Sequence, residues 1–325
     1  MADKYIDLHL HLDGAVTVGI ARKLADLQGI SLPSDDDKLS EMLTVPSDCK
    51  SLNDFLKCFD LPLSLMQTEE GISEAVCLVC DEQKAQNVIY AEIRFAPQLH
   101  TEKGLTQEQV IKAALKGLSE TDLKANLILC FMRMEGNESA NEETLELAKK
   151  YLTENGGVVA VDLAGAEALF PVEKYKKLFE KAKENRIPFT IHAGEAAGAE
   201  SVRLAVEYGA ARIGHGVRSY EDPELIGILG DRGICLEMCP TSNRQTHAVE
   251  DMSKYPLMDY LHKGLCVTIN TDDPGIEGTT LADEFKYIEK VFGLTESEKQ
   301  KILVNAINSA FTSEEVKAAL KEEVR

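Results

Sequence analysis

The sequence predicts an α/β protein built as a closed (β/α)8 TIM barrel, with a helical excursion after the first strand. Short apolar runs alternate with helical patterns along the 325-residue chain, and eight of the runs have strand character. This alternation implies parallel strands, and eight of them favour a closed barrel. An open, doubly wound sheet is the alternative. A dinucleotide-binding version of that sheet is disfavoured, because no Gly-x-Gly-x-x-Gly turn follows the first strand.

The first strand is predicted from an apolar run that opens at Tyr5 and ends at the turn residue Gly14. A helix over 16–28 follows, and then a polar, acidic excursion over 31–51. The next apolar residues have the i, i+3, i+4, i+7 spacing of an amphipathic helix that should end before Pro62. These residues are Leu52, Phe55, Leu56 and Phe59. They are expected to dock on the core or, alternatively, to form a wall over a ligand pocket.

Each remaining strand follows a predicted helix, and no linker-like or low-complexity stretch interrupts the series. Residues 1–325 are therefore predicted to form a single domain. In chain order the helix and strand pairs are 71–86 and 88–95, 106–120 and 125–134, 141–154 and 158–163, 172–185 and 187–192, 199–208 and 211–214, 223–231 and 234–238, and 256–263 and 265–270, followed by helices 281–292 and 296–311 and a charged tail.

Composition limits the classes of partner. A hydrophobic content of 44% is enough for a large core, and no apolar run is long enough to span a bilayer. The net charge of −20 argues against nucleic acid, phosphorylated substrates or anionic membranes, and favours a neutral or cationic small molecule. Eight scattered cysteines and no signal-peptide pattern predict reduced thiols in a cytoplasmic protein. The oligomeric state is not predicted.

Ionisable residues gather at the predicted carboxyl ends of four strands, where barrel enzymes place their chemistry. Taken singly, each group has a plain structural explanation, such as a hydrogen-bonded core histidine or the start of a turn. Because all of these groups are predicted to lie at the same rim of the barrel, they indicate one shared site. The groups are His9 and His11 on the first strand, His192 and Glu195 on the fifth, His215 on the sixth, and Asp272 and Asp273 on the eighth.

The residue types at this rim predict a mononuclear metal site. His9, His11 and His192 supply neutral nitrogens, and Asp272 is the best-placed carboxylate, a set suited to zinc or a similar divalent ion. An exchangeable position would bind water and lower its pKa. Outside the ligand set, Glu195 suits a general acid or proton shuttle, and His215 and Asp273 could orient the water or accept its proton.

Two related kinds of metal site fit less well. Two-metal barrels use a modified lysine at the end of the fourth strand, where this chain has Asp162-Leu163-Ala164-Gly165. Barrel-like phosphoesterases with a His-x-His pair need more histidines, and their substrates suit the negative charge poorly. The other three histidines, His100, His247 and His262, fall in loops or helices and are not expected to bind metal.

Together these motifs resemble the adenosine deaminase family of metal-dependent amidohydrolases over nearly the whole chain. They appear in the family's order, at the expected strand ends. The cytidine deaminases differ, with His-x-Glu and a later Pro-Cys-x-x-Cys. The matching stretches are His9-Leu10-His11-Leu12-Asp13-Gly14, Asp162-Leu163-Ala164-Gly165, His192-Ala193-Gly194-Glu195, Gly214-His215-Gly216, Cys239-Pro240-Thr241-Ser242-Asn243 and Thr271-Asp272-Asp273-Pro274.

The resemblance implies a hydrolase of purine metabolism with one Zn²⁺ per chain, held by His9, His11, His192 and Asp272. A zinc-activated hydroxide would attack purine C6 and convert adenosine or 2′-deoxyadenosine to inosine or deoxyinosine and ammonia. Glu195 would protonate N1, while His215 and Asp273 would position and deprotonate the water. In the substrate pocket, His11 would also contact the substrate, Asp273 would face N7, the Gly165 N–H would meet N3, Asp13 would bind the ribose hydroxyl, and Leu52, Phe55, Leu56 and Phe59 would form the cap.

The exact substrate is left open by the sequence. Asp13 matches the family members that act on the nucleoside, whereas adenine-specific relatives tend to have Glu there. AMP-specific relatives are much longer and need a phosphate site, for which no basic cluster is present. The alternatives are an adenine or modified-adenosine deaminase and, in another class, an inactive purine-binding protein. The last would be expected to lack Glu195, His215 or a metal ligand, and all are present.

Overall fold

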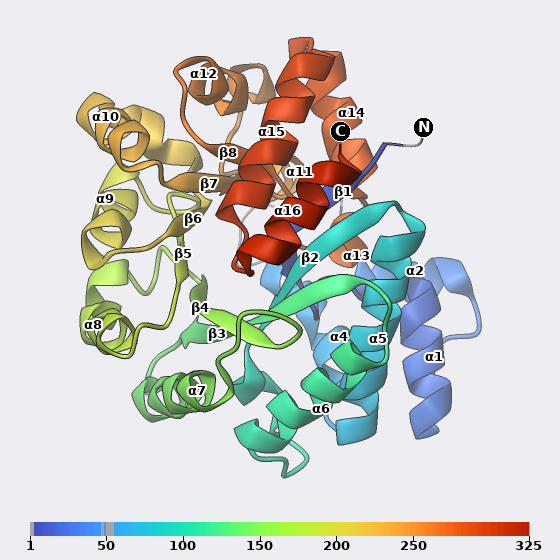
Figure 1. The fold of residues 1–325 in the computed structure, drawn as a ribbon. Helices are drawn as coiled ribbons and strands as arrows, with labels where there is room; N and C mark the ends of the chain where they lie inside the picture. The colour runs from blue at the N-terminus through green and yellow to red at the C-terminus, as the bar shows by residue number, and fades with distance from the viewer. Residues whose placement is uncertain (1–2, 47–48, 50–54, 325) are drawn as a thin grey trace.

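A computed structural model describes residues 3–46, 49 and 55–324 of the chain (Figure 1). Parallel strands form the centre, as predicted from the helix and strand alternation, and helices surround them. The described residues form eight strands: β1 (Tyr5–His11), β2 (Val88–Phe95), β3 (Lys124–Arg133), β4 (Val158–Gly165), β5 (Thr190–Ala193), β6 (Arg212–His215), β7 (Cys235–Met238) and β8 (Val267–Ile269).

The strands close into a barrel through two short seams. Strands β1–β4 and β5–β8 form two four-stranded parallel sheets in sequence order. Val161 bridges to Phe189 between the sheets. At the other seam Leu10 bridges to Asp272, and the Asp272 N–H donates to the His9 carbonyl at 2.8 Å. The predicted (β/α)8 fold is confirmed, and the second seam joins the first predicted ligand strand directly to the last.

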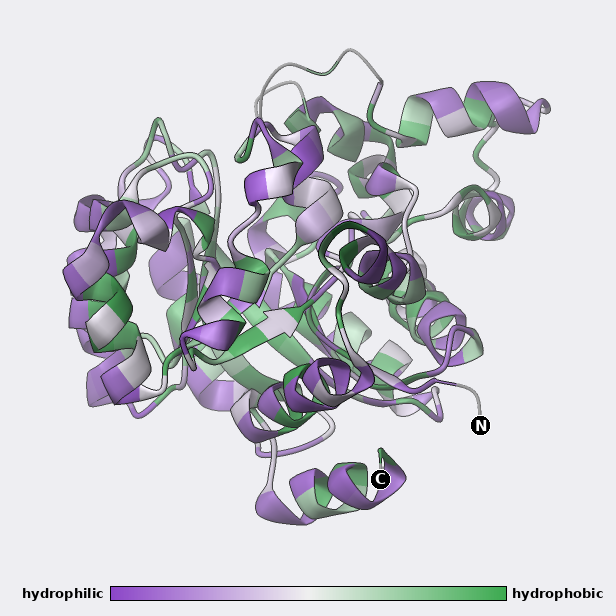
Figure 2. Cartoon of the chain, turned by 90° about the horizontal axis from the view of Figure 1, so that it is seen from above, coloured by the Kyte–Doolittle hydropathy of each residue, from purple (hydrophilic) through white to green (hydrophobic). Residues whose placement is uncertain are grey.

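The surrounding helices turn their apolar residues toward the strands, as the hydropathy colouring in Figure 2 shows. This pattern buries one continuous core between the two layers. The helices after the excursion are α5 (Glu69–Ala85), α6 (Gln107–Ser119), α7 (Glu138–Tyr151), α8 (Lys176–Glu184), α9 (Ala199–Tyr208), α10 (Pro223–Arg232), α11 (Pro240–Gln245), α12 (Leu257–His262), α13 (Pro274–Glu277), α14 (Leu281–Phe292), α15 (Glu296–Ser309) and α16 (Glu314–Glu323), and the 3₁₀ turns are η2 (Pro97–His100), η3 (Val172–Tyr175), η4 (Val217–Glu221) and η5 (Met252–Lys254).

The predicted helix before Pro62 is wrong at its end. A 3₁₀ turn, η1 (Leu56–Phe59), continues into α4 (Asp60–Leu65), so Pro62 lies inside helical structure. Pro62 is the third residue of α4, and a backbone N–H there has no partner within the helix, so proline costs little. Leu52 lies outside the described residues.

The excursion and the chain terminus are more ordered than the sequence analysis expected. The helix predicted over 16–28 is α1 (Val18–Gln28), and the polar excursion over 31–51 contains the helix α2 (Asp36–Leu43), which buries Leu39 and Leu43. The predicted charged tail is the helix α16, whose Leu320 is buried against Ile6, Leu8 and Tyr90. These residues belong to the first halves of β1 and β2, so α16 covers the amino ends of these strands (Figure 1).

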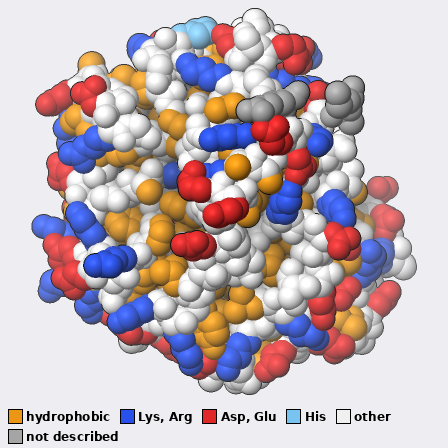
Figure 3. Space-filling model, in the orientation of Figure 1, with side chains coloured by type: hydrophobic (Ala, Val, Ile, Leu, Met, Phe, Trp, Pro, Cys, Tyr) orange, Lys and Arg blue, Asp and Glu red, His pale blue; other side chains and the backbone are white. Residues whose placement is uncertain are grey.

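The surface and the thiols agree with the compositional analysis. Acidic and basic side chains are interspersed on the face shown in Figure 3. The thiols of Cys58, Cys77, Cys80, Cys130, Cys235, Cys239 and Cys266 form no disulfide. None of the helices built from the described residues has the length and apolar character of a bilayer-spanning segment. That residues 1–325 act as one domain stays a prediction.

Charged residues fill the inside of the barrel below the carboxyl ends of the strands. The Arg94 guanidinium contacts the carboxylates of Asp162 and Glu237, both at 2.8 Å. The Arg212 guanidinium contacts Glu237 at 2.5 Å and Glu92 at 2.6 Å. All five side chains are at most 1% exposed. Buried charges need such partners, because an unpaired charge in the interior is strongly destabilising. We refer to these five residues as the buried charge network.

Arg212→Met should lower the free energy of unfolding by about 3–5 kcal/mol, because Glu92 loses its guanidinium partner and Glu237 loses one of two. Lys84→Ala is the control, since its ion pair with Asp122 is exposed, and should cost at most about 1 kcal/mol. Urea unfolding followed by circular dichroism measures both values. Equal effects of the two substitutions would contradict the structural role of the buried charge network.

Candidate active site

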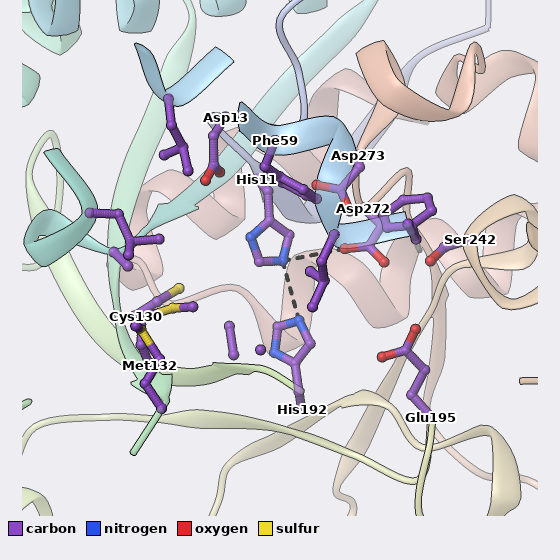
Figure 4. A pocket seen from close by; sticks show the side chains of 18 of the residues that line it. His11, Asp13, Phe59, Cys130, Met132, His192, Glu195, Ser242, Asp272 and Asp273 are labelled. Carbon is purple, nitrogen blue, oxygen red and sulfur yellow. Dashed lines mark hydrogen bonds and ion pairs between the residues drawn. The ribbon is translucent and has the colours of Figure 1, made fainter. Parts of the chain in front are cut away.

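A cavity of about 380 Å³ opens at the carboxyl ends of the strands. Figure 4 shows its polar side chains on one side and the sulfur-containing side chains of Cys130 and Met132 on another. The described residues that line it include neither lysine nor arginine. Its volume falls in the range that small-molecule sites occupy. The cavity therefore suits an uncharged ligand of modest size.

Three imidazoles and one carboxylate meet at the floor of this cavity. Nε2 of His192 lies 3.1 Å from Nε2 of His9 and 3.2 Å from Nε2 of His11. Oδ1 of Asp272 lies 3.1 Å from Nε2 of His9 and 3.3 Å from Nε2 of His11. The dashed lines in Figure 4 join His11 to His192 and to Asp272. The structure thus brings together the four side chains that the sequence analysis selected as metal ligands.

Buried carboxylates set the orientation of two of these rings. Nδ1 of His9 lies 2.8 Å from Glu237, and Nδ1 of His192 lies 2.8 Å from Asp162. Each Nδ1 therefore carries the proton, and the lone pair of Nε2 points into the cavity. Two lone pairs facing one another at 3.1 Å repel unless a cation lies between them. The donor set of imidazole nitrogens and one carboxylate fits a single divalent ion such as zinc.

His215 is part of the same cluster. His9, His192, His215 and Asp272 each place one donor atom within 4.8 Å of the others. Nε2 of His215 lies 3.7 Å from Oδ2 of Asp272 and 3.7 Å from Oε2 of Glu195. The ring therefore lies between the donor cluster and the predicted acid, which fits its predicted role beside the ligands.

Asn243 and Tyr255 hold His215 from behind. The Tyr255 hydroxyl lies 2.9 Å from Oδ1 of Asn243, and Nδ2 of Asn243 lies 3.0 Å from Nδ1 of His215. With the amide in this orientation Asn243 donates to Nδ1, so Nε2 of His215 carries a proton and points at the cavity. Burial holds the pKa of His215 well below its ordinary value, so the ring is neutral. Tyr255 was not singled out in the sequence, and Asn243 was noted there only as part of a motif.

The backbone at two of these residues is strained. His215 and Asp272 have φ values of 59° and 67°, in the left-handed region that residues other than glycine seldom adopt. Asp273, the residue after Asp272, packs closely against Gly14, because a Cβ at position 14 would lie 1.7 Å from Oδ1 of Asp273. The strained backbone and this close packing aim the side chains of His215, Asp272 and Asp273 into one cavity, at a cost that the rest of the barrel must offset.

Glu195 and Asp273 are buried carboxyl groups that favour the protonated form. Burial, with the nearby carboxylates of Asp272 and Glu167, raises the pKa of Glu195 to about 8. Burial and Asp272 also raise the pKa of Asp273 well above its ordinary value. By contrast, the pKa of Asp272 lies well below its ordinary value, because the contacts with His9 and His215 outweigh its burial. The protonated form is thus favoured at Glu195 and Asp273, and the ionised form at the neighbouring Asp272.

The remaining predicted pocket residues line the cavity where the structure describes them. Phe55, Leu56 and Phe59 form an apolar side, with Asp13 and Gly165 also at the lining. This result supports the pocket-wall interpretation of that segment over a purely structural one. Oδ1 of Asp13 is buried and has no hydrogen-bond partner within the described part of the chain, so it can accept one from a ligand.

The histidines that were not expected to bind metal have contacts elsewhere. Nδ1 of His100 lies 2.9 Å from the Met66 carbonyl. Nε2 of His247 lies 2.9 Å from the Cys49 carbonyl, and Nε2 of His262 lies 2.6 Å from Glu298. None of the three lines the cavity.

The model of the family described as "Adenosine deaminase" matches residues 5–325. The chain belongs to the adenosine deaminase family. It is 47% identical over 322 residues to an adenosine deaminase of Haemophilus ducreyi, covering 97% of this chain and 94% of the relative. An adenosine deaminase of Enterococcus faecalis is 38% identical, with 98% and 95% covered. The resemblance inferred from the sequence motifs is confirmed.

Solved structures give the same assignment. An adenine deaminase from Arthrobacter aurescens superposes with a TM-score of 0.89 and 30% identity, covering 99% of this chain and 98% of the other. An N6-mAMP deaminase from Arabidopsis gives a TM-score of 0.85 and 25% identity, with 99% and 97% covered. The deaminase barrel is therefore shared across relatives whose names differ in substrate.

Several supporting residues of the site were missed in the sequence. Glu92 and Arg94 interrupt an otherwise apolar strand two residues apart, and Glu237 interrupts another, which was a usable signal for charges inside the barrel. Glu167 lies in a loop and carried no such signal. Its contacts appear only when strands β4 and β5 are placed side by side.

Substituting His9 should abolish metal binding, because His9 contacts both His192 and Asp272 in the donor cluster. After loading with Zn²⁺ and desalting, we expect about one ion per wild-type chain and almost none for His9→Ala. His262→Ala is the control, because its ring is exposed and lies 2.6 Å from Glu298, outside the cavity. Elemental analysis measures the metal content. Full metal content in His9→Ala would rule out this cluster as the site.

Proposed function

We propose that the chain is a zinc-dependent adenosine deaminase, which hydrolyses adenosine and 2′-deoxyadenosine to inosine and deoxyinosine with release of ammonia. The observation that carries the proposal is the meeting of the donor cluster and the buried Glu195 carboxyl in one cavity, whose described lining includes neither lysine nor arginine. The names of the relatives support the same activity.

His9, His11, His192 and Asp272 are proposed to hold one zinc ion. When bound, the ion supplies a water of lowered pKa as the nucleophile. His11 is preferred over His215 as the fourth ligand, because Nε2 of His11 lies 3.3 Å from Asp272, whereas Nε2 of His215 lies 3.7 Å away. Asn243 also directs a protonated Nε2 of His215 at the cavity, which suits a hydrogen-bond donor.

The other residues move or hold protons on the purine. Glu195 keeps its proton near neutral pH and donates it to N1, which makes C6 electrophilic. Burial and the nearby Asp272 carboxylate raise the pKa of Asp273, and this carboxyl is proposed to donate to N7. His215 orients the attacking water. Gly165 offers its N–H to N3, and the His11 ring lies against the purine. Phe55, Leu56 and Phe59 exclude water from above.

The lining favours a nucleoside over a nucleotide. A 5′-phosphate would carry negative charge into a cavity whose described lining has four acidic side chains and no basic partner. Asp13 is proposed to accept a hydrogen bond from the ribose hydroxyl through its unpartnered Oδ1. An adenine deaminase remains the second candidate, because the Arthrobacter aurescens protein of that name superposes closely.

A cytoplasmic location is also proposed, because the seven cysteines from Cys58 to Cys266 form no disulfide. The partner is a small purine nucleoside, and no nucleic-acid or membrane partner is proposed.

The function is tested by the ultraviolet absorbance change of the purine ring as adenosine becomes inosine. We expect turnover with adenosine and 2′-deoxyadenosine, a lower kcat/KM with adenine, and the lowest with AMP. A chelator should remove the activity and Zn²⁺ should restore it. No turnover of any adenine compound by the zinc-loaded chain would favour an inactive purine-binding protein. Preference for adenine over adenosine would instead favour the second candidate.

Glu195→Gln should retain zinc and lower kcat by about 10²–10⁴-fold, because the amide cannot transfer a proton to N1. The zinc content and KM for adenosine should stay close to those of the wild type. The absorbance assay with adenosine measures kcat and KM, and elemental analysis measures the zinc content. Near-normal kcat in a zinc-loaded variant would contradict the proton-transfer role of Glu195.

A further inference from the structure

Glu167 is a buried acid that none of the roles above uses. It lies in the loop after β4 and is 1% exposed. Its Oε1 accepts hydrogen bonds from the Gly194 N–H at 2.9 Å and from the Ser201 hydroxyl at 2.5 Å. Its Oε2 accepts from the N–H groups of Glu195 at 3.1 Å, Ala196 at 2.8 Å and Ala197 at 2.9 Å. One carboxylate thus binds four consecutive backbone amides.

This loop carries Glu195, the proposed acid. Residues 194–197 connect the end of β5 to α9, and Gly194 begins the loop with φ of 77°. Four successive N–H groups can reach one carboxylate only if the chain curves around it. Removing that carboxylate would leave four donors without their acceptor in a largely buried loop.

The end of β5, two residues before the loop, is anchored by a side chain from β3. The Arg133 guanidinium donates to the His192 carbonyl at 2.5 Å and to the Phe170 carbonyl at 2.6 Å. The end of β5 is therefore held by Arg133, and the loop that follows is held by Glu167. Side-chain rotation then remains the main freedom of Glu195.

We propose that Glu167 is a positioning residue for Glu195: it fixes the backbone of 194–197 so that the Glu195 carboxyl is aimed at N1 of the purine. The inference rests on the proposed function of Glu195. Displacement of an aligned catalytic group by about 1 Å can cost about 10²-fold in rate. Glu167 itself is neither one of the described residues that line the substrate cavity nor a member of the donor cluster.

The chemistry of the contacts requires a carboxylate. All five partners are donors, and the two oxygens of Glu167 accept two and three hydrogen bonds. Glutamine would place an NH₂ group against at least two of these donors. Aspartate would keep both oxygens but is shorter by one methylene, so it should retain part of the network.

The experiment compares Glu167→Gln and Glu167→Asp with a matched control, Glu221→Gln. Glu221 is exposed and accepts a hydrogen bond from the Ala199 N–H at 3.2 Å, just beyond the loop. Each variant is assayed as the zinc-loaded chain for kcat and KM with adenosine, for zinc content, and for hydrogen–deuterium exchange of peptides that cover 194–197.

For Glu167→Gln we expect kcat to fall by about 10²-fold with little change in KM or zinc content. The amides of 194–197 should exchange faster, because their acceptor is lost. Glu167→Asp should restore part of kcat and part of the protection from exchange. Glu221→Gln should resemble the wild type in every measurement.

Several outcomes would overturn the inference. One is that the wild type is active and Glu167→Gln has the same kcat. Another is that Glu167→Gln loses activity only because it loses zinc. If Glu167→Gln does not fold, Glu167→Asp and Ser201→Ala decide, since Ser201→Ala removes only the hydroxyl donor to Oε1. If both variants had the kcat and the amide exchange of the wild type, Glu167 would not position Glu195. An inactive wild type would instead refute the proposed function.

Discussion

The candidate site depends on the Arg94 guanidinium. Arg94 lies inside the barrel and joins Asp162 of β4 to Glu237 of β7, at 2.8 Å each. The same two carboxylates hold Nδ1 of His192 and of His9. One buried cation therefore fixes the two anions that orient two of the proposed ligands. Because this pairing is dry and rigid, the rings cannot turn without breaking contacts that are costly to lose in the interior.

The charges around the cluster also indicate what the cavity floor would bind. Arg94 and Arg212 face three carboxylates inside the barrel, those of Glu92, Asp162 and Glu237. The Asp272 carboxylate adds a fourth anion beside His9. Among these six side chains, the carboxylates outnumber the guanidinium groups. A divalent cation at the Nε2 atoms would balance this excess, which agrees with the donor chemistry argued from the histidines.

The sequence was sufficient for the barrel and for the rim, because both follow from one rule. Parallel strands end at the same side of the barrel, so His9, His192 and Asp272 had to meet once their strands were assigned. The predicted end of the helix before Pro62 was wrong, because this proline lies near the start of α4, where proline is tolerated. Glu167 was not predictable, since its partners begin 27 residues later and form no local pattern. The left-handed backbone at His215 and Asp272 likewise has no signal in residue type.

Two populations of buried carboxyl group explain how this acidic interior can act on a purine. Asp162 and Glu237 have pKa values well below the ordinary range: burial opposes the shift, but His192 and Arg94 outweigh it at Asp162, and Arg94 and Arg212 do so at Glu237. Within the described residues, neither Glu195 nor Asp273 forms an ion pair with an arginine or a lysine, and burial raises the pKa values of both. The first group stays ionised and holds the rings, while the second keeps protons that ring nitrogens can accept. The arginines lie below the cluster and not among the described residues of the cavity wall, and this placement separates the two roles.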